Sequence, residues 1–585
     1  MNVASASPGG LTCRGTAAPL ESLVASLARR AELDRAAFTH IDYRKDRAGL
    51  AHTLSWSEVH ERVGALAAAI TELAAPSERV AVLCPQDLNY PVGFLGALAA
   101  GTIAVPLFAP EASSHAARLI GALADCRAAV WLTTQASMDA VDELLCDPRV
   151  PRPAGVIAVD RVALGTAREP RAPDVDLEAP AYLQYTSGAT RDPAGAVISH
   201  RAVAANVRQG IDALELDEHT TSVGWIPFFH DMGLMMLICA PVVLGSRAVF
   251  SAPFDFVQRP RRWLEQLSGH TNVLTAAPNF AFDYAVERVA PRDRASLDLS
   301  GVHVAINGSE PVRAGTVQRF QEAFGPHGFA PEAHRPSYGL AEATLFVTTS
   351  GAGGPRTTGF ARGELMSGHA VAARSEAEAT RLVSAGSPAG QCVCIVDPDT
   401  RTIRADGDVG EIWVHGPNVA SGYWGQTERS SEVFDARLIG GGDGLPAVGW
   451  LRTGDLGVRH DGELYITGRL KEVIIVDGKN HYPHDIEETV QGAHPAIRAG
   501  RVAAFGMSTE DGEAIVVVME RARGNVGTQA PTAEISTAVR RAVAAAHDLK
   551  LRDIEILDGT KVLRTSSGKI ARAANRERYV AGREH

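Results

Sequence analysis

The feature that most constrains the fold is a repeated alternation of short apolar runs with helix-like segments, which begins at about residue 78. RVAVLC (79–84) has the composition of a buried strand, YPVGFLGALAAG that of a helix ending at Gly101, and TIAVPLF that of the next strand. Such alternation is typical of a parallel or mixed α/β sheet, whose ligands bind beyond the carboxyl ends of the strands. It therefore predicts an α/β protein with a site at one sheet edge.

Similar strand-like runs recur further along the chain, at AYLQYT (181–186), VGWIP (223–227), NVLTAAP (272–278) and HVAIN (303–307). Each of them is followed by a polar or glycine-rich loop. Because the carboxyl ends of parallel strands meet at one edge, we expect the functional side chains in these loops.

The length of 585 residues exceeds one compact core, so at least two domains are expected. A Gly- and charge-rich segment, 351–382, interrupts the strand rhythm and is either a partly ordered surface excursion or a linker. After residue 400 strands and turns dominate, with a hairpin signal at Asp461-Gly462. The prediction is a large N-terminal domain (1–469) of mixed β-sheets flanked by helices, followed by a small α+β domain (470–585).

Composition and charge exclude several classes of protein. With 57 basic and 68 acidic residues the net charge is −11, and the basic residues are interspersed, so nucleic acid is not an expected partner. The longest apolar runs contain Gly and Pro and fall short of a membrane span, and the first residues do not resemble a signal peptide. Seven scattered cysteines form neither a disulfide framework nor a zinc pattern, and Cys392 and Cys394 are expected on one face of a strand. These features predict a reduced, cytoplasmic protein.

The stretch TSGATRDPAGAVISH (186–200) has the small, hydroxylated and glycine-bearing composition of a loop that wraps phosphates. It is not a Walker loop, because the glycines are too far apart and no Lys follows them. Ala194 stands where a phosphate-binding lysine is wanted, between Pro193 and Gly195. On composition alone, a plain Ser/Thr/Gly turn between a strand and a helix is an equal alternative.

Other stretches of the sequence indicate which kind of phosphate-binding loop this is. YTSGATRDPAG resembles the signature loop of the adenylate-forming superfamily, which comprises acyl-CoA synthetases, adenylation domains and luciferases. Family-like patterns follow in order at WIPFFHDMGL (225–234), NGSEP (307–311), SYGLAEAT (337–344), LRTGDLG (451–457), GRLKEVIIVDG (468–478) and RTSSGKIAR (564–572). The resemblance covers nearly the whole chain, and so many ordered motifs make chance implausible.

Several variants narrow the resemblance to the fatty acyl-AMP ligases. They are Arg-x-Pro-Ala-Gly in place of Gly-x-Pro-Lys-Gly, and the forms FHDMGL, AEATLFV and DGKNHYPHDIE. The 351–382 excursion also lies where those ligases carry an extra segment relative to acyl-CoA synthetases. The resemblance further implies that the small domain is mobile, with its hinge at Lys471.

The resemblance implies a site for ATP and Mg²⁺. The outer phosphates would be bound by hydroxyls and backbone N–H groups of the first loop, from Thr186, Ser187, Gly188 and Thr190. Arg191 would supply the cation that Ala194 lacks, although a guanidinium cannot occupy the same point as an ammonium. The alternative for Arg191 is a solvated loop residue. Glu342 resembles the family's magnesium ligand, which suits a hard cation that prefers carboxylate oxygen.

The nucleoside would be held by later motifs. Tyr338 would stack on adenine, with core packing as its alternative, and the base pocket would be lined by Ser309, Glu310 and Gly339. Asp455 would accept hydrogen bonds from the two ribose hydroxyls, and Arg469 would help to orient ribose and phosphate.

The remaining residues concern the reaction and the acyl chain. Lys569 would reach the α-phosphate and acyl oxygens as charge develops there, and the alternative is an exposed basic tail. His230 would position the carboxylate or phosphate, and the alternative is a structural role beside the two preceding Phe residues. Asp231 is expected to cap a helix. Candidates for an acyl pocket are Met232, Gly233, Phe280 and Phe282, for which core packing is an equally good account.

Together these motifs resemble a ligase that activates a fatty acid with ATP to an acyl-adenylate and releases pyrophosphate. The family implies that the acyl group then passes to the phosphopantetheine of an acyl carrier protein of a polyketide or peptide synthase. One alternative is a fatty acyl-CoA ligase, disfavoured by the Arg191/Ala194 variant and the excursion. The other is a catalytically silent nucleotide- or lipid-binding relative, which the joint presence of Glu342, Asp455, Arg469 and Lys569 opposes.

Overall fold

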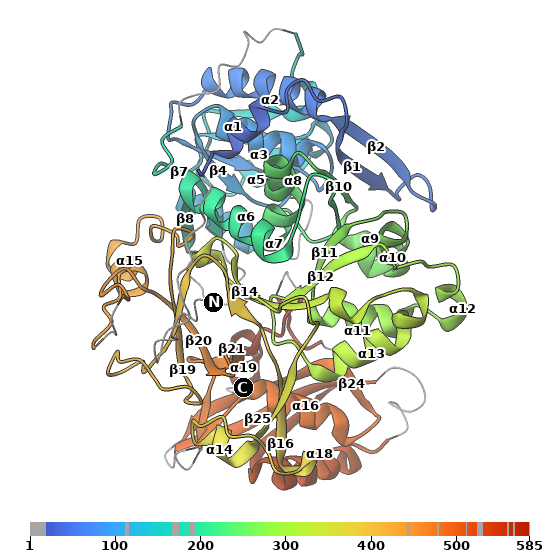
Figure 1. Ribbon diagram of the computed structural model, residues 1–585, viewed down its shortest axis with the longest axis vertical. Coiled ribbons are helices and arrows are strands. Elements are labelled where there is room, and N and C mark those ends of the chain that lie inside the picture. The colour runs from blue at the N-terminus through green and yellow to red at the C-terminus, as the bar shows by residue number, and fades with distance from the viewer. Residues whose placement is uncertain are drawn as a thin grey trace, which may run out of the picture.

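The alternating segments after residue 78 form a six-stranded sheet in the computed structural model (Figure 1). The structure describes residues 19–110, 116–165, 175–185, 193–440, 444–476, 479–509, 512–522, 530–558, 561–565 and 568–583. The strands lie in the order β6-β5-β3-β4-β7-β8, with bounds β3 (Arg79–Val82), β4 (Ile103–Pro106), β5 (Val130–Thr133), β6 (Gly155–Ala158), β7 (Pro180–Tyr185) and β8 (Gly195–Ser199). Neighbours pair in parallel except β7 and β8, which are antiparallel.

A second, nine-stranded sheet has the order β17-β14-β13-β12-β11-β9-β10-β1-β2. Its bounds are β1 (Ala36–Asp42), β2 (Leu50–Ser55), β9 (Thr221–Gly224), β10 (Arg247–Phe250), β11 (Val273–Pro278), β12 (Val302–Gly308), β13 (His334–Gly339), β14 (Phe346–Thr349) and β17 (Ser387–Pro388). The strands from β1 to β13 pair in parallel through β10, β9, β11 and β12, and antiparallel strands close both edges. The predicted strand at 223–227 ends at Gly224, because Trp225 leaves the sheet to stack on Phe256 at 3.8 Å between ring centroids.

Helices fill the space between the two sheets and cover the outer face of the second. The helices of this part are α1 (Leu23–Ala28), α2 (Trp56–Thr71), α3 (Asn89–Ala99), α4 (Ala116–Cys126), α5 (Met138–Leu145), α6 (His200–Leu214), α7 (Asp231–Leu234), a π-helical turn (Met235–Cys239), α8 (Ala240–Leu244), α9 (Pro253–Gln258), α10 (Arg261–Ser268), α11 (Asn279–Arg288), α12 (Pro291–Arg294) and α13 (Ala314–Phe324). One apolar cluster joins β3 and β5 of the first sheet to β11 and β12 of the second through α2, α3, α6 and the π-helical turn. The main core therefore lies between the sheets.

The segment between the second sheet and the C-terminal part is antiparallel. Its four-stranded sheet has the order β18 (Cys392–Val396), β19 (Gly410–His415), β20 (Leu451–His460) and β21 (Glu463–Arg469), with α15 (Thr427–Phe434) beside it. Asp461 and Gly462 form the predicted hairpin turn, both with positive φ. Cys392 and Cys394 share one buried cluster, which confirms that they lie on one strand face.

The 351–382 excursion is ordered. Strands β15 (Thr357–Ala361) and β16 (Ala379–Val383) form an antiparallel pair, with α14 (Arg362–Met366) after the first. Phe360 and Leu365 are buried in a cluster that also contains Tyr482 from the C-terminal part. The excursion is therefore a packed element and not a linker.

The residues after Leu470 build a separate α+β unit, called the C-terminal unit below (residues 471–583). It contains one strand pair, β22 (Ile474–Val476) with β23 (Lys479–His481), and one three-stranded sheet, β24 (Ile497–Thr509), β25 (Gly512–Arg521) and β26 (Leu551–Leu557). The helices of this unit are α16 (Pro483–Ala493), α18 (Thr532–His547) and α19 (Arg572–Ala581). Helices α16 and α18 bury Ile486, Val490 and Val539 against the sheet. The α/β class with a small α+β unit is confirmed. The boundary at residues 469 and 470 remains a prediction.

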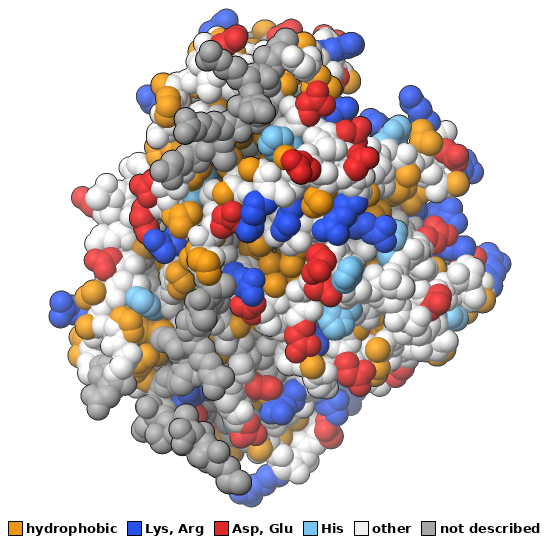
Figure 2. All heavy atoms as spheres, turned by 45° about the horizontal axis from the view of Figure 1, so that its top comes forward, with side chains coloured by type: hydrophobic (Ala, Val, Ile, Leu, Met, Phe, Trp, Pro, Cys, Tyr) orange, Lys and Arg blue, Asp and Glu red, His pale blue; other side chains and the backbone are white. Residues whose placement is uncertain are grey.

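Two surface features bear on partners. In the part of the chain that the structure describes, no helix is long and apolar enough to cross a membrane. Figure 2 shows Lys and Arg side chains interspersed with Asp and Glu on the face it presents, as the sequence indicates.

Candidate active site

A cavity of about 430 Å³ opens between the nine-stranded sheet, the four-stranded sheet and the C-terminal unit. It collects residues from motifs that are hundreds of positions apart in the sequence. The predicted site residues that line it are His230, Met232, Ser309, Glu310, Tyr338, Gly339, Glu342, Asp455, Arg469 and Lys569. These ten predictions therefore describe one place in the molecule.

Tyr338, Asp455 and Arg469 form a hydrogen-bonded group on the cavity wall. The Tyr338 hydroxyl donates to Asp455 Oδ2 at 2.8 Å, and Arg469 Nε lies 2.9 Å from Asp455 Oδ1. The Asp455 carboxylate raises the pKa of the Arg469 guanidinium, and burial raises the pKa of the Tyr338 hydroxyl well above its usual value. Gly339 must be glycine here, because a Cβ would lie 1.9 Å from the carbonyl oxygen of Leu345. The group offers a charged acceptor and a charged donor to a polyhydroxylated ligand.

The position of Asp455 is set by a buried glutamate that sequence analysis missed. Glu411 on β19 accepts from the backbone N–H of Gly454 at 3.1 Å and from Arg452 Nε at 3.0 Å. The Thr453 hydroxyl donates to the carbonyl of Ile412 at 2.7 Å. These bonds hold the turn before Asp455 against the neighbouring strand.

Glu342 lies in the turn between β13 and β14 and accepts from the Tyr423 hydroxyl at 2.8 Å. Burial raises the pKa of its carboxyl above the usual value. Among the described residues no group of three or more His, Cys, Asp or Glu side chains could hold a metal. Mg²⁺ is commonly held by one or two carboxylates together with phosphate oxygens and water, so a single carboxylate at this wall fits a magnesium–nucleotide complex.

Lys569 reaches the cavity from the C-terminal unit on a loop that docks against α11. Arg564 lies over the ring of Phe280 at 4.9 Å, and Gly568, with a positive φ, packs closely against the same ring. The backbone N–H of Phe280 donates to Glu310 Oε1 at 2.6 Å. Burial lowers the pKa of the Lys569 ammonium, while the charge of Asp231 acts in the opposite direction.

His230 and Asp231, at the start of α7, also line this cavity. His230 is the N-cap of this helix, so the expectation that Asp231 is the capping residue is corrected by one position. His230 Nδ1 lies 2.6 Å from Asp231 Oδ1, and the Met232 N–H donates to that carboxylate oxygen at 2.7 Å. Burial alone would raise the pKa of the Asp231 carboxyl, but the neighbouring His230 and Lys569 bring it below its usual value.

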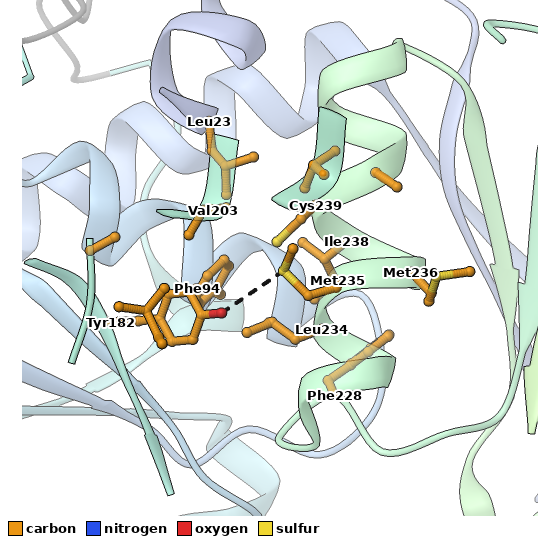
Figure 3. Packing of buried hydrophobic residues seen from close by; sticks show 14 of the residues in the cluster. Leu23, Phe94, Tyr182, Val203, Phe228, Leu234, Met235, Met236, Ile238 and Cys239 are labelled. Carbon is orange, nitrogen blue, oxygen red and sulfur yellow. Dashed lines mark hydrogen bonds between the residues drawn. The ribbon is translucent and has the colours of Figure 1, made fainter. Parts of the chain in front are cut away.

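The apolar end of the cavity lies between α6 and the π-helical turn. Its walls are formed by Val207, Gly210, Ile211 and Leu214 on α6 and by Met232, Met235, Met236 and Ala240 on the other side. Figure 3 shows Met235 pointing toward Tyr182, whose hydroxyl lies 3.8 Å from the Met235 sulfur, whereas Met236 points away from it. Of these wall residues, Met232 alone is predicted from the sequence to contact the substrate. The helical spacing of 207, 211 and 214 was a signal of burial, but it did not distinguish a cavity wall from a core.

Three predicted acyl-pocket residues do not line this cavity. Phe282 is buried in a cluster of rings, 5.6 Å from Trp263, 5.0 Å from Phe320 and 4.7 Å from His334 between centroids. Phe280 packs against Arg564 and Gly568 of the loop that carries Lys569. At Gly233 a Cβ would lie 2.2 Å from the carbonyl oxygen of Pro227, so its small size serves backbone packing. Core packing and loop docking describe these positions better than acyl binding.

Two residues that precede the first loop in the sequence also line the cavity. Thr186, Ser187, Gly188, Thr190 and Arg191 lie outside the described residues. Gln184 and Tyr185, immediately before them, line the cavity, and Tyr185 donates to Asp125 of α4 at 2.5 Å. Arg118, seven residues earlier on the same helix, lines the cavity too, and burial lowers the pKa of its guanidinium. Arg118 is a second candidate for the cation missing at Ala194, and no motif pointed to it.

Lys471 follows the last residue pair of the four-stranded sheet and does not line the cavity. Backbone bonds fix the chain on both sides of it, from Leu470 N to Gly454 O at 2.9 Å and from Val473 N to Arg469 O at 3.1 Å. The hinge assignment therefore remains a prediction, at a point where the two parts of the chain are joined.

Comparison with known proteins places this site in a family. The sequence matches the model of the AMP-binding enzyme family over residues 26–424 and that of the Disco-interacting protein 2-like AMP domain over residues 471–584. The chain is 43% identical over 555 residues to long-chain-fatty-acid–AMP ligase FadD26 of Mycobacterium marinum, covering 93% of this chain and 94% of that protein. It is 42% identical over 599 residues to the corresponding FadD32 of Mycolicibacterium smegmatis, covering 96% and 94%.

A solved structure agrees with these relatives. The fatty acyl-adenylate ligase of Legionella pneumophila, in complex with acyl adenylate and pyrophosphate, is 31% identical with a TM-score of 0.73, and the match covers 96% of each chain. The chain therefore belongs to the AMP-binding, adenylate-forming enzymes and, within them, to the fatty acyl-AMP ligases.

Proposed function

We propose that this protein uses ATP to activate a long-chain fatty acid as its acyl-adenylate, and then passes the acyl group to the phosphopantetheine thiol of an acyl carrier protein. The observation that carries the first step is the two-ended cavity. A polar end with Tyr338, Asp455, Arg469 and Lys569 continues into an apolar end lined by methionines and α6. A ligand that suits both ends combines a nucleotide with a hydrocarbon chain.

In this proposal the carboxylate oxygen of the fatty acid attacks the α-phosphorus of ATP. A carbon–oxygen–phosphorus linkage forms as the bond to the departing pyrophosphate breaks. Lys569 donates to the negative charge that develops between the two groups, and His230 holds the carboxylate at the junction of the polar and apolar ends. Asp455 and Arg469 fix the ribose. Mg²⁺, when bound at Glu342, would neutralise phosphate charge.

The second step rests on family membership alone, and the ordered excursion bears instead on whether free CoA can serve as the acceptor. Arg362 of α14 donates to the carbonyl of Ala546 at the end of α18, at 3.0 Å, and Phe360 shares a cluster with Tyr482. Both contacts tie the C-terminal unit to the excursion. In the superfamily, the second half-reaction is expected to need a rotation of the C-terminal unit, and a restraint of this kind opposes that rotation.

The test of the first step combines the protein with Mg²⁺, ATP and a labelled C12 or C16 fatty acid, with and without CoA and a phosphopantetheinylated carrier protein. Acyl-adenylate that persists beside CoA and is consumed by the carrier supports the proposal. Conversion to acyl-CoA would establish the acyl-CoA ligase alternative instead. No adenylate from folded protein that binds ATP would indicate a silent relative.

A shortened chain also tests the second step, and the shortening removes Arg381, Leu382 and Val383, which line the cavity. The Ser384 N–H donates to the Arg356 carbonyl at 2.9 Å, so residues 357–383 can be removed and the chain closed across these neighbours. If the excursion restrains the C-terminal unit, the shortened protein should acylate some CoA, and Arg362→Ala should do so more weakly. A shortened protein that makes adenylate and still ignores CoA would contradict this role for the excursion.

A further inference from the structure

Gly210 occupies an unusual position in the middle of α6. Helical spacing of three and four residues places it on the same face as Val203, Val207 and Leu214, all of which are buried. The charged pair Arg208–Asp212 is half-exposed and lies on another face. Glycine weakens a helix interior relative to alanine, so a glycine at the centre of the buried face calls for a reason.

Close packing, the ordinary reason, does not apply at Gly210. At Gly96 of α3, a Cβ would lie 2.6 Å from Leu66 of α2, and glycine is therefore needed for the two helices to meet. At Gly210 a Cβ would meet no atom within 4 Å. Since Gly210 also lines the cavity, the space in front of it is the cavity itself.

The wall opposite α6 is apolar. Helix α6 packs against the π-helical turn and α8, from which Met235, Met236 and Ala240 line the same cavity. A side chain at position 210 would extend from α6 into this apolar space. Its volume would then be lost to any ligand that occupies the apolar end.

We infer that Gly210 determines the length of the acyl chain that this protein accepts, by leaving the apolar end of the cavity open beside α6; this inference rests on the proposed function. A hydrocarbon chain running between α6 and the π-helical turn passes Gly210 without obstruction. A larger residue there truncates the channel, so short acids still bind while long ones meet the new side chain.

The test measures acyl-adenylate formation with saturated acids from C6 to C18 for the wild type, Gly210→Ala and Gly210→Leu. Because one methylene too many in an apolar pocket costs roughly ten- to a hundredfold in kcat/KM, Gly210→Leu should lose at least that much with the longest acids and retain activity with the shortest. Gly210→Ala should shift the preferred length slightly in the same direction. The KM for ATP should stay unchanged, since the polar end is untouched.

Gly492 provides a matched control. It lies in α16 of the C-terminal unit, is exposed, has no atom within 4 Å of a built Cβ, and does not line the cavity. Gly492→Leu should keep the wild-type chain-length profile. Thermal unfolding identifies folded variants, and if Gly210→Leu does not fold, the better helix former Gly210→Ala decides the question.

The outcomes separate the inference from the proposed function. An active wild type whose chain-length profile is the same in every folded Gly210 variant contradicts the inference and leaves the proposed function standing. A uniform loss with all acids contradicts it too, because it indicates general damage. A wild type that adenylates no acid of any length overturns the proposed function and the inference with it.

Discussion

The two ends of the cavity are built in different ways. The polar end is assembled from turns, in which Asp455 follows a turn held by Glu411, Glu342 lies between β13 and β14, and Lys569 arrives on a loop of the C-terminal unit. The apolar end is formed by helix faces, with Val207 on α6 and Met235 on the π-helical turn. In the polar end the identity of each side chain matters, whereas in the apolar end the shape left between helices matters. Substitutions should therefore affect the rate at one end and substrate length or stability at the other.

The largest expected effect concerns a residue that the structure assigns to neither end. Phe282→Ala removes a fully buried ring that packs against Trp263, Phe320 and His334. Because deletion of a core aromatic leaves a cavity, the free energy of unfolding should fall by about 3–5 kcal/mol. Chemical denaturation measures this loss. The chain-length profile of the folded fraction should not change, and a shift in that profile would return Phe282 to the acyl pocket.

Lys569→Ala tests the polar end of the cavity. The loss of a donor to developing charge should reduce the rate of acyl-adenylate formation by about 10²–10³, with ATP binding little changed. Single-turnover kinetics and equilibrium ATP binding separate the two effects. Lys550→Ala, at an exposed position of the same unit, serves as the control. A Lys569→Ala protein with undiminished turnover would remove this lysine from the mechanism.

The same lysine predicts the alkaline limb of the pH profile. Its ammonium must be protonated to donate, and burial lowers its pKa, so it loses its proton at a lower pH than an exposed lysine. The value of kcat/KM, which reports the free enzyme, should therefore fall on the alkaline side before an exposed lysine would titrate. Lys569→Arg should move this limb to higher pH, because a guanidinium keeps its proton. An alkaline limb that is identical in both proteins would assign it to another group.

The difference between the polar and the apolar end of the cavity also explains which site residues could be predicted from the sequence. Short motifs in loops identified ten residues that line the cavity, because a polar side chain in a fixed local pattern has few structural reasons to be there. Val207 and Met235 carry no such signal, since an apolar residue on a helix face looks the same beside a core and beside a cavity. Nothing near Phe280 in the sequence indicates its packing partner, because the loop at Gly568 is almost three hundred residues away. Nor did the composition of the excursion reveal that Phe360 shares a buried cluster with Tyr482 of the C-terminal unit.

Asp455→Asn tests the nucleoside part of the polar end. The amide keeps the size of the side chain but loses the charge that pairs with Arg469. Hydrogen bonds to charged groups contribute about 1.5–3 kcal/mol, so KM for ATP should rise roughly ten- to a hundredfold while the chain-length preference stays the same. Steady-state kinetics with two acids of different length measures both quantities. A change in chain-length preference would mean that the two ends of the cavity are coupled and do not act separately.

The smallest expected effect concerns Tyr423, which contacts the predicted magnesium ligand Glu342. The Tyr423 hydroxyl donates to Glu342, and this bond opposes the rise in the carboxyl pKa that burial causes. Tyr423→Phe removes the donor and keeps the ring, which packs 5.0 Å from Phe434. A neutral donor contributes about 0.5–1.5 kcal/mol, so the pKa of Glu342 should rise further and Mg²⁺-dependent activity should fall a few-fold, more at low pH than at high pH. The sign follows because a protonated carboxyl cannot bind Mg²⁺, and a higher pKa extends the protonated form to higher pH. Activity measured as a function of Mg²⁺ concentration at two pH values checks both the loss and its pH dependence. If added Mg²⁺ relieves the loss at neither pH, Tyr423 positions the β13–β14 turn and does not act on the metal site.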